Sequence, residues 1–471
     1  MNLPVVHTFE TDEVLPFWQA FSENPGTTLL ESTLKVAGYS DYSFMGVAPF
    51  GTFSVRDGVG YWNETPCVES PFKALKQCLG QFTFVHTNLG PFYGGAMGYL
   101  GYELAQSLED LPIHPHPDVD VPMAYLGFYD LVFVFNHITK KTHLVSSGLS
   151  VAHPEGCSIH ARERLAWALS VLEKHANEHV KHPQNDTVAK TPDSCGPIIS
   201  TEDRDSYIAM VEKIQEHIRA GDIFQACVSQ RLQASLNRIR PQNLYEQMRL
   251  THQAPFSGYL SIPGGALIAA SPERLLQSVA GHLRTEPIKG TIRRGKTAEE
   301  DQQLAQQLSA CPKNRAENIM IVDLMRNDFS KVCLPSSVVV PELCQLSSFT
   351  TVHHLISVVE GELAPGYSTV DALAACFPGG SVTGAPKIRA MELITEVEKR
   401  PRNTYCGCFG YIGFDGNMDM AMTIRTFLCM QDTVYLHVGG AVTLDSDPAS
   451  EYEESCVKGL GLKKLLSGAT S

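Results

Sequence analysis

Short apolar runs bounded by glycine, proline and asparagine recur along the chain, and they constrain its fold more than any other feature. Clear examples in the first third lie at residues 93–101, 124–128 and 131–136. Aromatic and branched side chains favour strands, whereas Gly, Pro and Asn mark the turns between them. We therefore predict a first third that is rich in β-strands.

The remainder of the chain mixes strands with helices. An apolar stripe at helical spacing starts at Tyr207 and is followed by Gly221, which predicts a helix that ends at a glycine. Residues 223–232 alternate apolar and polar side chains, which predicts a half-buried strand with Phe224 on its apolar side and Gln225 on its polar side. Further helices are predicted at residues 313–332, directly after Pro386, and at residues 448–466.

A polar stretch with few large apolar side chains divides the chain. We predict an N-terminal region at residues 1–175, a linker at residues 176–198 and a C-terminal region at residues 199–468. Composition limits the partners, because 37 basic against 51 acidic residues give a net charge of −14. An acidic surface repels nucleic-acid phosphates and anionic lipid, so neither nucleic acid nor a membrane is expected as a partner.

The ends and the cysteines of the chain bear on its compartment. The first residues have no basic start followed by an apolar core, and no apolar run approaches ~18 residues. The 13 cysteines are scattered without a repeated framework. These features favour a cytoplasmic protein with reduced thiols.

An acid and an amine stand out in the segment 271–295. Glu273 precedes Lys289 by a stretch that can fold back as a hairpin, which would bring the two side chains to one side of the molecule. A buried glutamic acid can act as a general acid, and a lysine can act as a nucleophile. Arg293 and Arg294 would make the neighbourhood cationic and favour an anionic substrate. The alternative is a surface ion pair, which would contribute at most ~1 kcal/mol.

A second candidate set contains carboxylates. Glu451, Glu454 and Lys458 share one face of the predicted C-terminal helix. Glu454, with Glu317 from another helix and Glu451 nearby, could hold Mg²⁺, which needs only one or two protein carboxylates. The alternative is a solvated helix face with an internal ion pair.

The glycine-rich loop 379–387 precedes a predicted helix. It has one residue too many before its lysine for a nucleotide phosphate loop, and Pro386 removes a backbone donor. Its backbone N–H groups could still bind a carboxylate, with Arg425 and Lys458 as charged clamps. In the pair His353-His354, neighbouring side chains in a strand point to opposite faces, so at most one serves a given site. A buried structural histidine remains the alternative.

A series of motifs runs in order through residues 200–465. They are SPERL at 271, PIKGT at 287, RAENIMIVDLMRND at 315, VHHL at 352, FPGGSVTGAPK at 377, GYIGF at 410, IRT at 424, GGA at 439 and DSDPASEYEES at 445. Together they resemble the chorismate-binding enzymes, which include the large subunits of anthranilate synthase and aminodeoxychorismate synthase, and isochorismate and salicylate synthases. The first third is similar to the family's first domain at LLES and YSFMG. The resemblance implies an α+β sandwich with two large facing antiparallel sheets flanked by helices.

Two positions indicate a branch of the family. Water-adding members carry a lysine where this chain has Gln225, and anthranilate synthases usually carry an alanine where it has Lys289. The resemblance is therefore strongest to the aminodeoxychorismate synthase branch, an aminotransferase activity of para-aminobenzoate and folate synthesis. It implies that Glu273 protonates the leaving C4 hydroxyl of chorismate, that Lys289 forms a covalent adduct at C2, and that ammonia then attacks C4.

The resemblance also implies the other contacts of the site. His354 would support catalysis, and Mg²⁺ would bind at Glu317 and Glu454. The implied substrate contacts are Gln225, Gly290, Thr291, Gly384, Arg425, Gly439 and Lys458. The ammonia would come from a separate glutamine amidotransferase subunit, and the product would pass to an aminodeoxychorismate lyase.

Two departures from the family pattern leave alternatives open. Asn314 stands where relatives often have an acid near the metal, and Asp41 stands where many have an arginine beside a tryptophan site. Such a site would involve Glu31, Ser32 and Ser43, in a regulatory or structural role. The other functions considered are anthranilate synthase component I and a non-catalytic subunit that senses chorismate or tryptophan.

Overall fold

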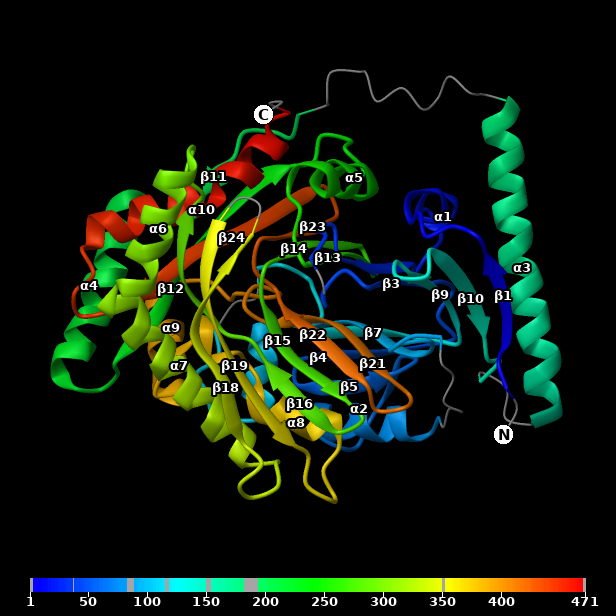
Figure 1. Ribbon diagram of the computed structural model, residues 1–471, viewed down its shortest axis with the longest axis horizontal. Helices are drawn as coiled ribbons and strands as arrows, with labels where there is room; N and C mark the ends of the chain where they lie inside the picture. The colour runs from blue at the N-terminus through cyan, green and yellow to red at the C-terminus, as the bar shows by residue number, and fades with distance from the viewer. Residues whose placement is uncertain are drawn as a thin grey trace.

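Two large antiparallel sheets face each other and are flanked by helices in the computed structural model, which describes residues 3–36, 38–82, 89–114, 118–149, 154–181, 194–349 and 352–468 (Figure 1). Each sheet has 12 strands. The predicted α+β sandwich is confirmed.

The first sheet contains strands from both ends of the chain. Its order is β1-β10-β9-β3-β2-β13-β14-β23-β24-β12-β11, and β20 pairs with β12. The bounds are β1 Val5–Phe9, β10 Lys141–Ser146, β9 Leu131–Asn136, β3 Tyr42–Gly46, β2 Thr28–Glu31, β13 Phe256–Ile262, β14 Gly265–Ser271, β23 Thr426–Met430, β24 Thr433–Val442, β12 Gln225–Ser235, β11 Ile199–Ser200 and β20 Gly384–Ala385.

The second sheet also mixes the two ends. Its order is β17-β19-β16-β15-β22-β21-β7-β8-β4-β5-β6, and β18 pairs with β19. The bounds are β17 Ile288–Arg293, β19 Val352–Glu362, β16 His282–Thr285, β15 Arg274–Val279, β22 Met418–Met422, β21 Cys408–Gly413, β7 Gly95–Leu100, β8 Ala124–Tyr129, β4 Gly51–Arg56, β5 Val59–Trp62, β6 Thr65–Pro66 and β18 Val339–Ser348.

The predicted N- and C-terminal regions share both sheets. β2 pairs with β13 in the first sheet, and β7 pairs with β21 in the second. The long helix α3 (Pro154–Lys181) runs into the stretch predicted as a linker, and residues 182–193 of that stretch lie outside the described residues. In Figure 1, α3 lies along the edge of the molecule beside β1 and β10. The two regions therefore form one interleaved sandwich, although the domain boundaries themselves stay a prediction.

Helices cover the outer faces of both sheets. Their bounds are α1 Leu15–Phe21, α2 Pro71–Gly80, α4 Arg204–Ala220, α5 Pro241–Thr251, α6 Ala298–Ala310, α7 Pro312–Ser330, α8 Thr369–Cys376, α9 Lys387–Val397 and α10 Pro448–Leu466, with 3₁₀ helices η1 Tyr102–Ser107 and η3 Gly380–Val382. α4 ends at Gly221 in the left-handed conformation, as its sequence predicted. α10 starts where the Asp447 side chain accepts a hydrogen bond from the Ser450 N–H, and its bounds match the prediction.

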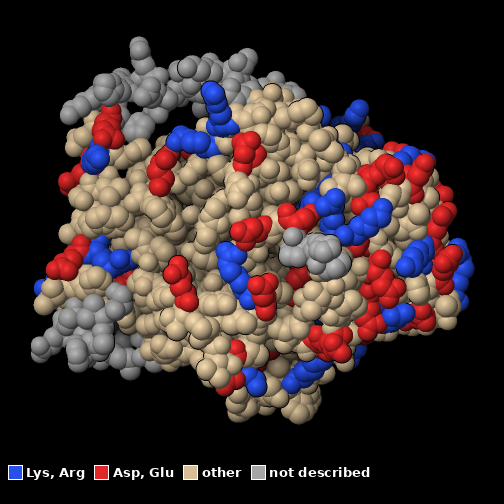
Figure 2. All heavy atoms as spheres, turned by 180° about the vertical axis from the view of Figure 1, so that it is seen from behind, with Lys and Arg blue, Asp and Glu red and all other residues tan. Residues whose placement is uncertain are grey.

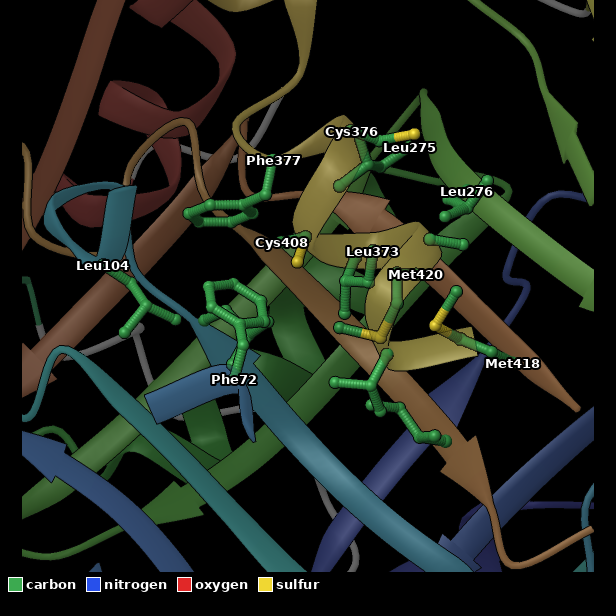
Figure 3. Packing of buried hydrophobic residues seen from close by; sticks show 14 of the residues in the cluster. Phe72, Leu104, Leu275, Leu276, Leu373, Cys376, Phe377, Cys408, Met418 and Met420 are labelled. Carbon is green, nitrogen blue, oxygen red and sulfur yellow. The ribbon is translucent and has the colours of Figure 1, made fainter. Parts of the chain in front are cut away.

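Among the described residues, four hydrophobic clusters hold this arrangement, and the smallest joins α4 and α9 to β12. The other three are larger. One lies between the sheets and includes Phe44 and Phe409. A second joins α1, α5 and α10 to the outer face of the first sheet. The third joins α2, α7 and α8 to the second sheet, and Figure 3 shows Leu275, Leu276 and Met420 of its strands packed with Leu373 of α8. Each fully buried side chain of this kind stabilises the fold by ~1.5–3 kcal/mol. These contacts therefore hold β15 firmly in place.

The surface and the helices add two observations. Acidic and basic side chains are intermixed over the face seen from behind, with no extended area of one sign (Figure 2). Within the described ranges, no helix is long and apolar enough to cross a membrane.

Candidate active site

The acid and the amine lie on the two sides of a hairpin. β15 and β16 pair so that Val279 faces His282 across a two-residue turn at Ala280-Gly281, where both φ angles are positive, 51° and 85°. This is the turn geometry that two-residue hairpin loops favour. The chain then returns as β17, which carries Lys289 back toward Glu273. The predicted hairpin path is confirmed.

Glu273 is buried, with 6% of its surface exposed. Burial raises its pKa, and this effect exceeds the opposing effects of hydrogen bonds from the Ser381 side chain and the Ile288 backbone and of the Lys289 charge. A raised pKa keeps the carboxyl group protonated at a higher pH than usual. Glu273 therefore has the property that a general acid needs.

Ser381 connects the acid to the amine. The Nζ of Lys289 donates a hydrogen bond to the Ser381 carbonyl at 3.1 Å, while the Ser381 side chain binds the Glu273 carboxyl group. Ser381 belongs to η3, in the glycine-rich loop that the sequence predicted as an anion site. Its bridging role was not predicted, because nothing in the local sequence places this loop beside the hairpin.

The strand that carries Lys289 is irregular at that residue. The pairing of β17 with β19 shifts between Ile288 and Thr291. Gly290 has a φ of 89°, and a Cβ there would lie 3.1 Å from Asn314. Only glycine fits this conformation and this close approach without strain. The irregularity presents Lys289 outside the regular strand, as bulges near active sites do.

His354 lies opposite this irregular segment. Its Nδ1 is 2.8 Å from the Thr291 hydroxyl oxygen. Burial, followed by the positive charge of Arg425, lowers the pKa of His354 to about 4, so its imidazole is neutral at pH 7. His353 points elsewhere: its Nε2 is 3.0 Å from an Asp301 oxygen and its Nδ1 is 2.7 Å from the Ser348 hydroxyl. As predicted, the two side chains point to different surroundings.

Arg425 supplies an unbalanced cation. It sits between β22 and β23 with a φ of 52°, an unusual conformation for a residue other than glycine. Its guanidinium group has no ion-pair or hydrogen-bond partner within the described part of the chain. The Arg425 side chain remains solvent accessible. Desolvation by the surrounding protein lowers the pKa of Arg425. Burial is the main cause that lowers the pKa of His252, and the charge of Arg425 is the next. An accessible, unpaired guanidinium suits a carboxylate ligand.

The prediction that Arg293 and Arg294 make the neighbourhood of Lys289 cationic is wrong. Arg293 donates to Glu300 at 2.5 Å, and Arg294 binds Asp301 through two nitrogens at 2.8 and 2.7 Å. Both acids belong to α6, which packs against β17 only in three dimensions. The two arginines are therefore neutralised, and the cationic character near Lys289 comes from other residues.

The predicted acidic face of α10 lies within range of Lys289. Glu454 forms an ion pair with Lys458 at 2.8 Å, and Lys458 also donates to the Gly439 carbonyl at 3.0 Å. Burial raises the pKa of Glu454, but the charges of Lys458, Lys313 and Lys289 outweigh this effect and lower it overall. Glu454 and the amine of Lys289 therefore act on each other electrostatically.

Glu451 is the buried member of this face. It accepts a hydrogen bond from the Ser446 hydroxyl at 2.6 Å, and burial followed by the charge of Glu454 raises its pKa. Lys313 acts on both acids and lies one turn before Glu317 on α7, so this face of α7 points toward α10. Glu317 is half-buried and has no hydrogen-bond or ion-pair partner in the described ranges.

These carboxylates would suit a cation that takes only one or two ligands from the protein. Within the residues that the structure describes, no three His, Cys, Asp or Glu side chains are grouped to hold a metal ion. Mg²⁺ needs only one or two carboxylates, because water and substrate oxygens complete its shell. The unpaired Glu317 and the mutual repulsion of Glu451 and Glu454 are the features that such a cation would relieve.

Gln225 and Gly384 lie side by side where β12 meets β20. A Cβ on Gly384 would lie 2.2 Å from the Gln225 carbonyl oxygen. Gln225 is fully buried, and neither atom of its amide group has a partner among the described residues. The prediction that it lies on a polar strand face opposite a buried Phe224 is wrong, because Phe224 is 71% exposed and precedes the strand. An unsatisfied buried amide is costly, which makes Gln225 a candidate for ligand contact.

The predicted tryptophan-site residues lie in a different part of the molecule. Glu31 and Ser32 line a cavity of about 620 Å³ together with Arg249, His137 and Lys140. Ser43 does not line it but lies 2.9 Å from the Nε2 of His137. This cavity is not at the acid and the amine, so the assignment of the active site rests on the chemistry of its side chains and not on volume.

We name five residues the acid–amine cluster: Glu273, Lys289, His354, Arg425 and Glu454. Electrostatic interactions link Lys289 to Glu273 and Glu454, and link Arg425 to His354, which contacts the strand of Lys289 at Thr291. The cluster combines a protonatable carboxyl group, an amine, a neutral imidazole, an unpaired guanidinium and a carboxylate. Such a set can donate a proton to a leaving group, attack as a nucleophile and bind an anionic substrate.

Known proteins match the chain along most of its length. Residues 36–463 match the chorismate binding enzyme family. The chain is 36% identical over 470 residues to anthranilate synthase component 1 of Thermus thermophilus, covering 99% of this chain and 98% of that protein. It is 38% identical over 446 residues to aminodeoxychorismate synthase component 1 of Klebsiella aerogenes, covering 93% of each.

A solved structure agrees with the fold. The crystal structure of anthranilate synthase component I from Streptococcus pneumoniae superposes with a TM-score of 0.78 at 30% identity, covering 90% of this chain and 92% of that chain.

Proposed function

The chain belongs to the chorismate binding enzyme family, and on that premise we propose that it converts chorismate and ammonia to 4-amino-4-deoxychorismate. It is a chorismate-utilising enzyme of the anthranilate synthase and aminodeoxychorismate synthase type. The observation that carries the finer assignment is the amine of Lys289, which lies beside the buried acid Glu273 and shares Ser381 with it.

The proposed first step forms a covalent adduct. The amine nitrogen of Lys289 attacks C2 of chorismate, both conjugated ring double bonds shift toward C4, and the bond from C4 to its hydroxyl oxygen breaks. Glu273 gives its proton to that oxygen, so the group leaves as water. Burial supports this role because it raises the pKa of Glu273.

The proposed second step releases the amine. Ammonia attacks C4, both ring double bonds shift back, and the bond between C2 and the Lys289 nitrogen breaks. The Glu273 carboxylate takes a proton from the incoming nitrogen and regains its starting form. Chorismate and ammonia thus give 4-amino-4-deoxychorismate and water, and both side chains are restored.

The substrate's anionic groups would meet the donors around the acid and the amine. Arg425 offers an unpaired guanidinium group, and Lys458 is held over the Gly439 carbonyl. The other proposed contacts are Gln225, Gly290, Thr291 and Gly384. His354, neutral and bound to the Thr291 hydroxyl, would support the ring or the leaving group as a hydrogen-bonding group.

We further propose Mg²⁺ as cofactor, held by Glu317 and Glu454 with Glu451 behind them. When bound, the ion would neutralise carboxylate charge on the substrate. Without Mg²⁺, Glu454 and Glu451 would repel the chorismate dianion. The nearby lysines reduce this repulsion, as the metal would.

A partner subunit is part of the proposal. The relatives are named component 1, which implies a second component. We propose a glutamine amidotransferase that supplies ammonia, with an aminodeoxychorismate lyase acting on the product. Free ammonia at high pH should replace the amidotransferase in vitro.

A tryptophan site is proposed for the N-terminal cavity. Glu31 and Ser32 line it together with Arg249, which is paired with Glu31. Equilibrium binding of radiolabelled tryptophan tests this site, and binding that is unchanged in Ser32→Ala would exclude the residue from it.

A product assay tests the proposed function. The enzyme, chorismate, ammonium salt at high pH and Mg²⁺ should yield 4-amino-4-deoxychorismate, with no pyruvate released. Anthranilate synthase is the second candidate, because relatives of both names match at similar identity, 36% and 38%. Formation of pyruvate and a fluorescent aromatic amine would establish that candidate instead. Chorismate binding without consumption would establish a sensing subunit.

A further inference from the structure

A largely buried group of charged residues includes the chain neighbours of the acid and the amine, Arg274 and Glu286. Arg274 donates through Nη1 to Glu286 at 2.9 Å and binds Asp419 through Nε and Nη2 at 2.9 and 3.0 Å. The Tyr39 hydroxyl donates to the same Glu286 oxygen at 2.6 Å. Arg284 binds the other Glu286 oxygen at 2.6 Å.

The place of these residues in the chain ties them to the chemistry. Arg274 directly follows Glu273 and is the first residue of β15. Glu286 stands just before Pro287 and Ile288, where the chain enters the strand of Lys289. The ion pair between Arg274 and Glu286 therefore joins the two backbone segments that carry the acid and the amine.

Both partners are withdrawn from solvent, with side chains 5% exposed on each side. Their surroundings add further restraint, because the Arg274 guanidinium lies 4.9 Å from the Tyr39 ring centre and 5.1 Å from that of Phe256. Burial opposes the charge on Glu286, but Arg274 leads the neighbours that lower its pKa overall. Each hydrogen-bonding atom of the Glu286 carboxylate is thus occupied, and the pair is fixed in one geometry.

The ion pair between Arg274 and Glu286 is better explained by the placement it gives to neighbouring residues than by a contribution to folding stability. A buried ion pair often contributes little net stability, because desolvation of the charges offsets their attraction. The Glu273 carboxyl group, however, receives a hydrogen bond from the Ile288 N–H. This contact exists only while residues 273 and 288 keep their separation, and the ion pair between the nearby residues Arg274 and Glu286 holds that separation.

Tyr39 comes from outside both segments. It precedes Ser40 and Asp41, which line the N-terminal cavity. Its ring packs edge to face on Phe256, with ring centres 5.7 Å apart, and its hydroxyl reaches Glu286. It is thus the member of the group that belongs to the N-terminal region of the sandwich.

We propose that Tyr39, Arg274 and Glu286 are positioning residues that set Glu273 and Lys289 in register for reaction. The inference rests on the proposed roles of that acid and that amine. Misplacement of a catalytic group by about 1 Å can cost a hundredfold in rate. Loss of the Tyr39 hydroxyl or of the Glu286 charge should therefore lower kcat while leaving the KM for chorismate nearly unchanged.

The test measures chorismate consumption with ammonia as nitrogen source, in the full chain with Mg²⁺. Tyr39→Phe keeps the ring and removes one hydrogen bond, and we expect kcat to fall about tenfold. Glu286→Gln keeps the size and removes the charge, and we expect a fall of about a hundredfold. Because Tyr39 acts through Glu286, the double variant should be no slower than Glu286→Gln alone.

Tyr99→Phe is the matched control. The Tyr99 hydroxyl is also buried and donates one hydrogen bond, to the Pro122 carbonyl at 2.7 Å. It lies on β7, away from the hairpin, so Tyr99→Phe should keep the wild-type kcat, and its effect should add to that of Glu286→Gln. A general loss of stability would affect both tyrosine variants alike.

The outcomes separate this inference from the proposed function. If Lys289→Ala is inactive but Tyr39→Phe has the kcat of Tyr99→Phe, the positioning role is wrong and the proposed function stands. If Lys289→Ala turns over normally, the roles of the acid and the amine fail, and the inference fails with them. Should Glu286→Gln not fold, Tyr39→Phe decides the question alone.

Discussion

The acid–amine cluster and the N-terminal cavity are both polar, but they balance their charges differently. In the cavity, Glu31 is paired with Arg249 at 2.7 Å, and Asp12 is paired with His137 at 2.9 Å. In the cluster, Glu454 is paired with Lys458, but Arg425 has no partner within the described part of the chain and the Lys289 amine donates its hydrogen bond to a carbonyl oxygen. Internal pairing supports structure, whereas unpaired charge is available to a substrate. Substitutions in the cluster should therefore affect catalysis first, and substitutions in the cavity should affect stability first.

Removal of the amine should have the largest effect. We expect Lys289→Ala to lower the rate of 4-amino-4-deoxychorismate formation with ammonia by about a thousandfold or more, because the covalent step needs the amine. Lys289→Arg keeps the charge and should be equally slow. Lys296→Ala is the control, since that lysine is exposed just beyond β17. Normal turnover in Lys289→Ala would show that catalysis does not need this amine, and the contrast between the two regions would then fail.

Replacement of the acid should have the next largest effect and should change the pH dependence. Glu273→Gln should slow the reaction by about 10²–10⁴-fold, the usual contribution of a general acid. The wild-type rate should fall as pH rises through the raised pKa of Glu273, because the carboxyl group then loses its proton. Single-turnover rates at constant free ammonia should show this decline in the wild type and not in the variant. The same decline in both would assign it to another group.

Loss of the free guanidinium should weaken binding more than turnover. A hydrogen bond to a charged group contributes ~1.5–3 kcal/mol, so Arg425→Gln should raise the KM for chorismate by roughly ten- to a hundredfold. Arg293→Gln is the matched control, because Arg293 is already paired with Glu300. Equal effects of the two variants would show that pairing in the free enzyme does not predict which arginine the substrate uses.

The smallest effect on activity is expected from the cavity. Arg249→Met leaves buried Glu31 with the Tyr245 hydroxyl as its remaining partner. We expect unfolding free energy to fall by ~1–3 kcal/mol, with kcat and KM for chorismate within about twofold of wild type. Urea unfolding and steady-state kinetics on the same preparation would measure both. A large change in kcat with unchanged stability would show that the cavity affects catalysis, which would contradict the contrast between the two regions.

Local signals in the sequence predicted what local contacts decide. The hairpin between the acid and the amine, the end of α4 at Gly221 and the bounds of α10 all follow from turn residues, capping and periodicity. The opposite directions of His353 and His354 follow from strand geometry. These features need no knowledge of distant residues.

Distant contacts account for what was missed. Arg293 and Arg294 are neutralised by α6, and Ser381 reaches the hairpin from a loop about ninety residues later, because tertiary packing brings them together. Gln225 is buried against β20, a pairing that alternation within one strand cannot reveal. The interleaving of N- and C-terminal strands in each sheet is likewise a property of the whole chain.

The covalent role of Lys289 is tested most directly by the mass of the protein after reaction with chorismate and Mg²⁺ without ammonia. We expect an added mass equal to chorismate less one water, located by peptide mapping at Lys289. The adduct should be absent in Lys289→Ala and should disappear when ammonia is added, with release of 4-amino-4-deoxychorismate. An unmodified Lys289 while the same preparation makes that product with ammonia would contradict a covalent role for the amine.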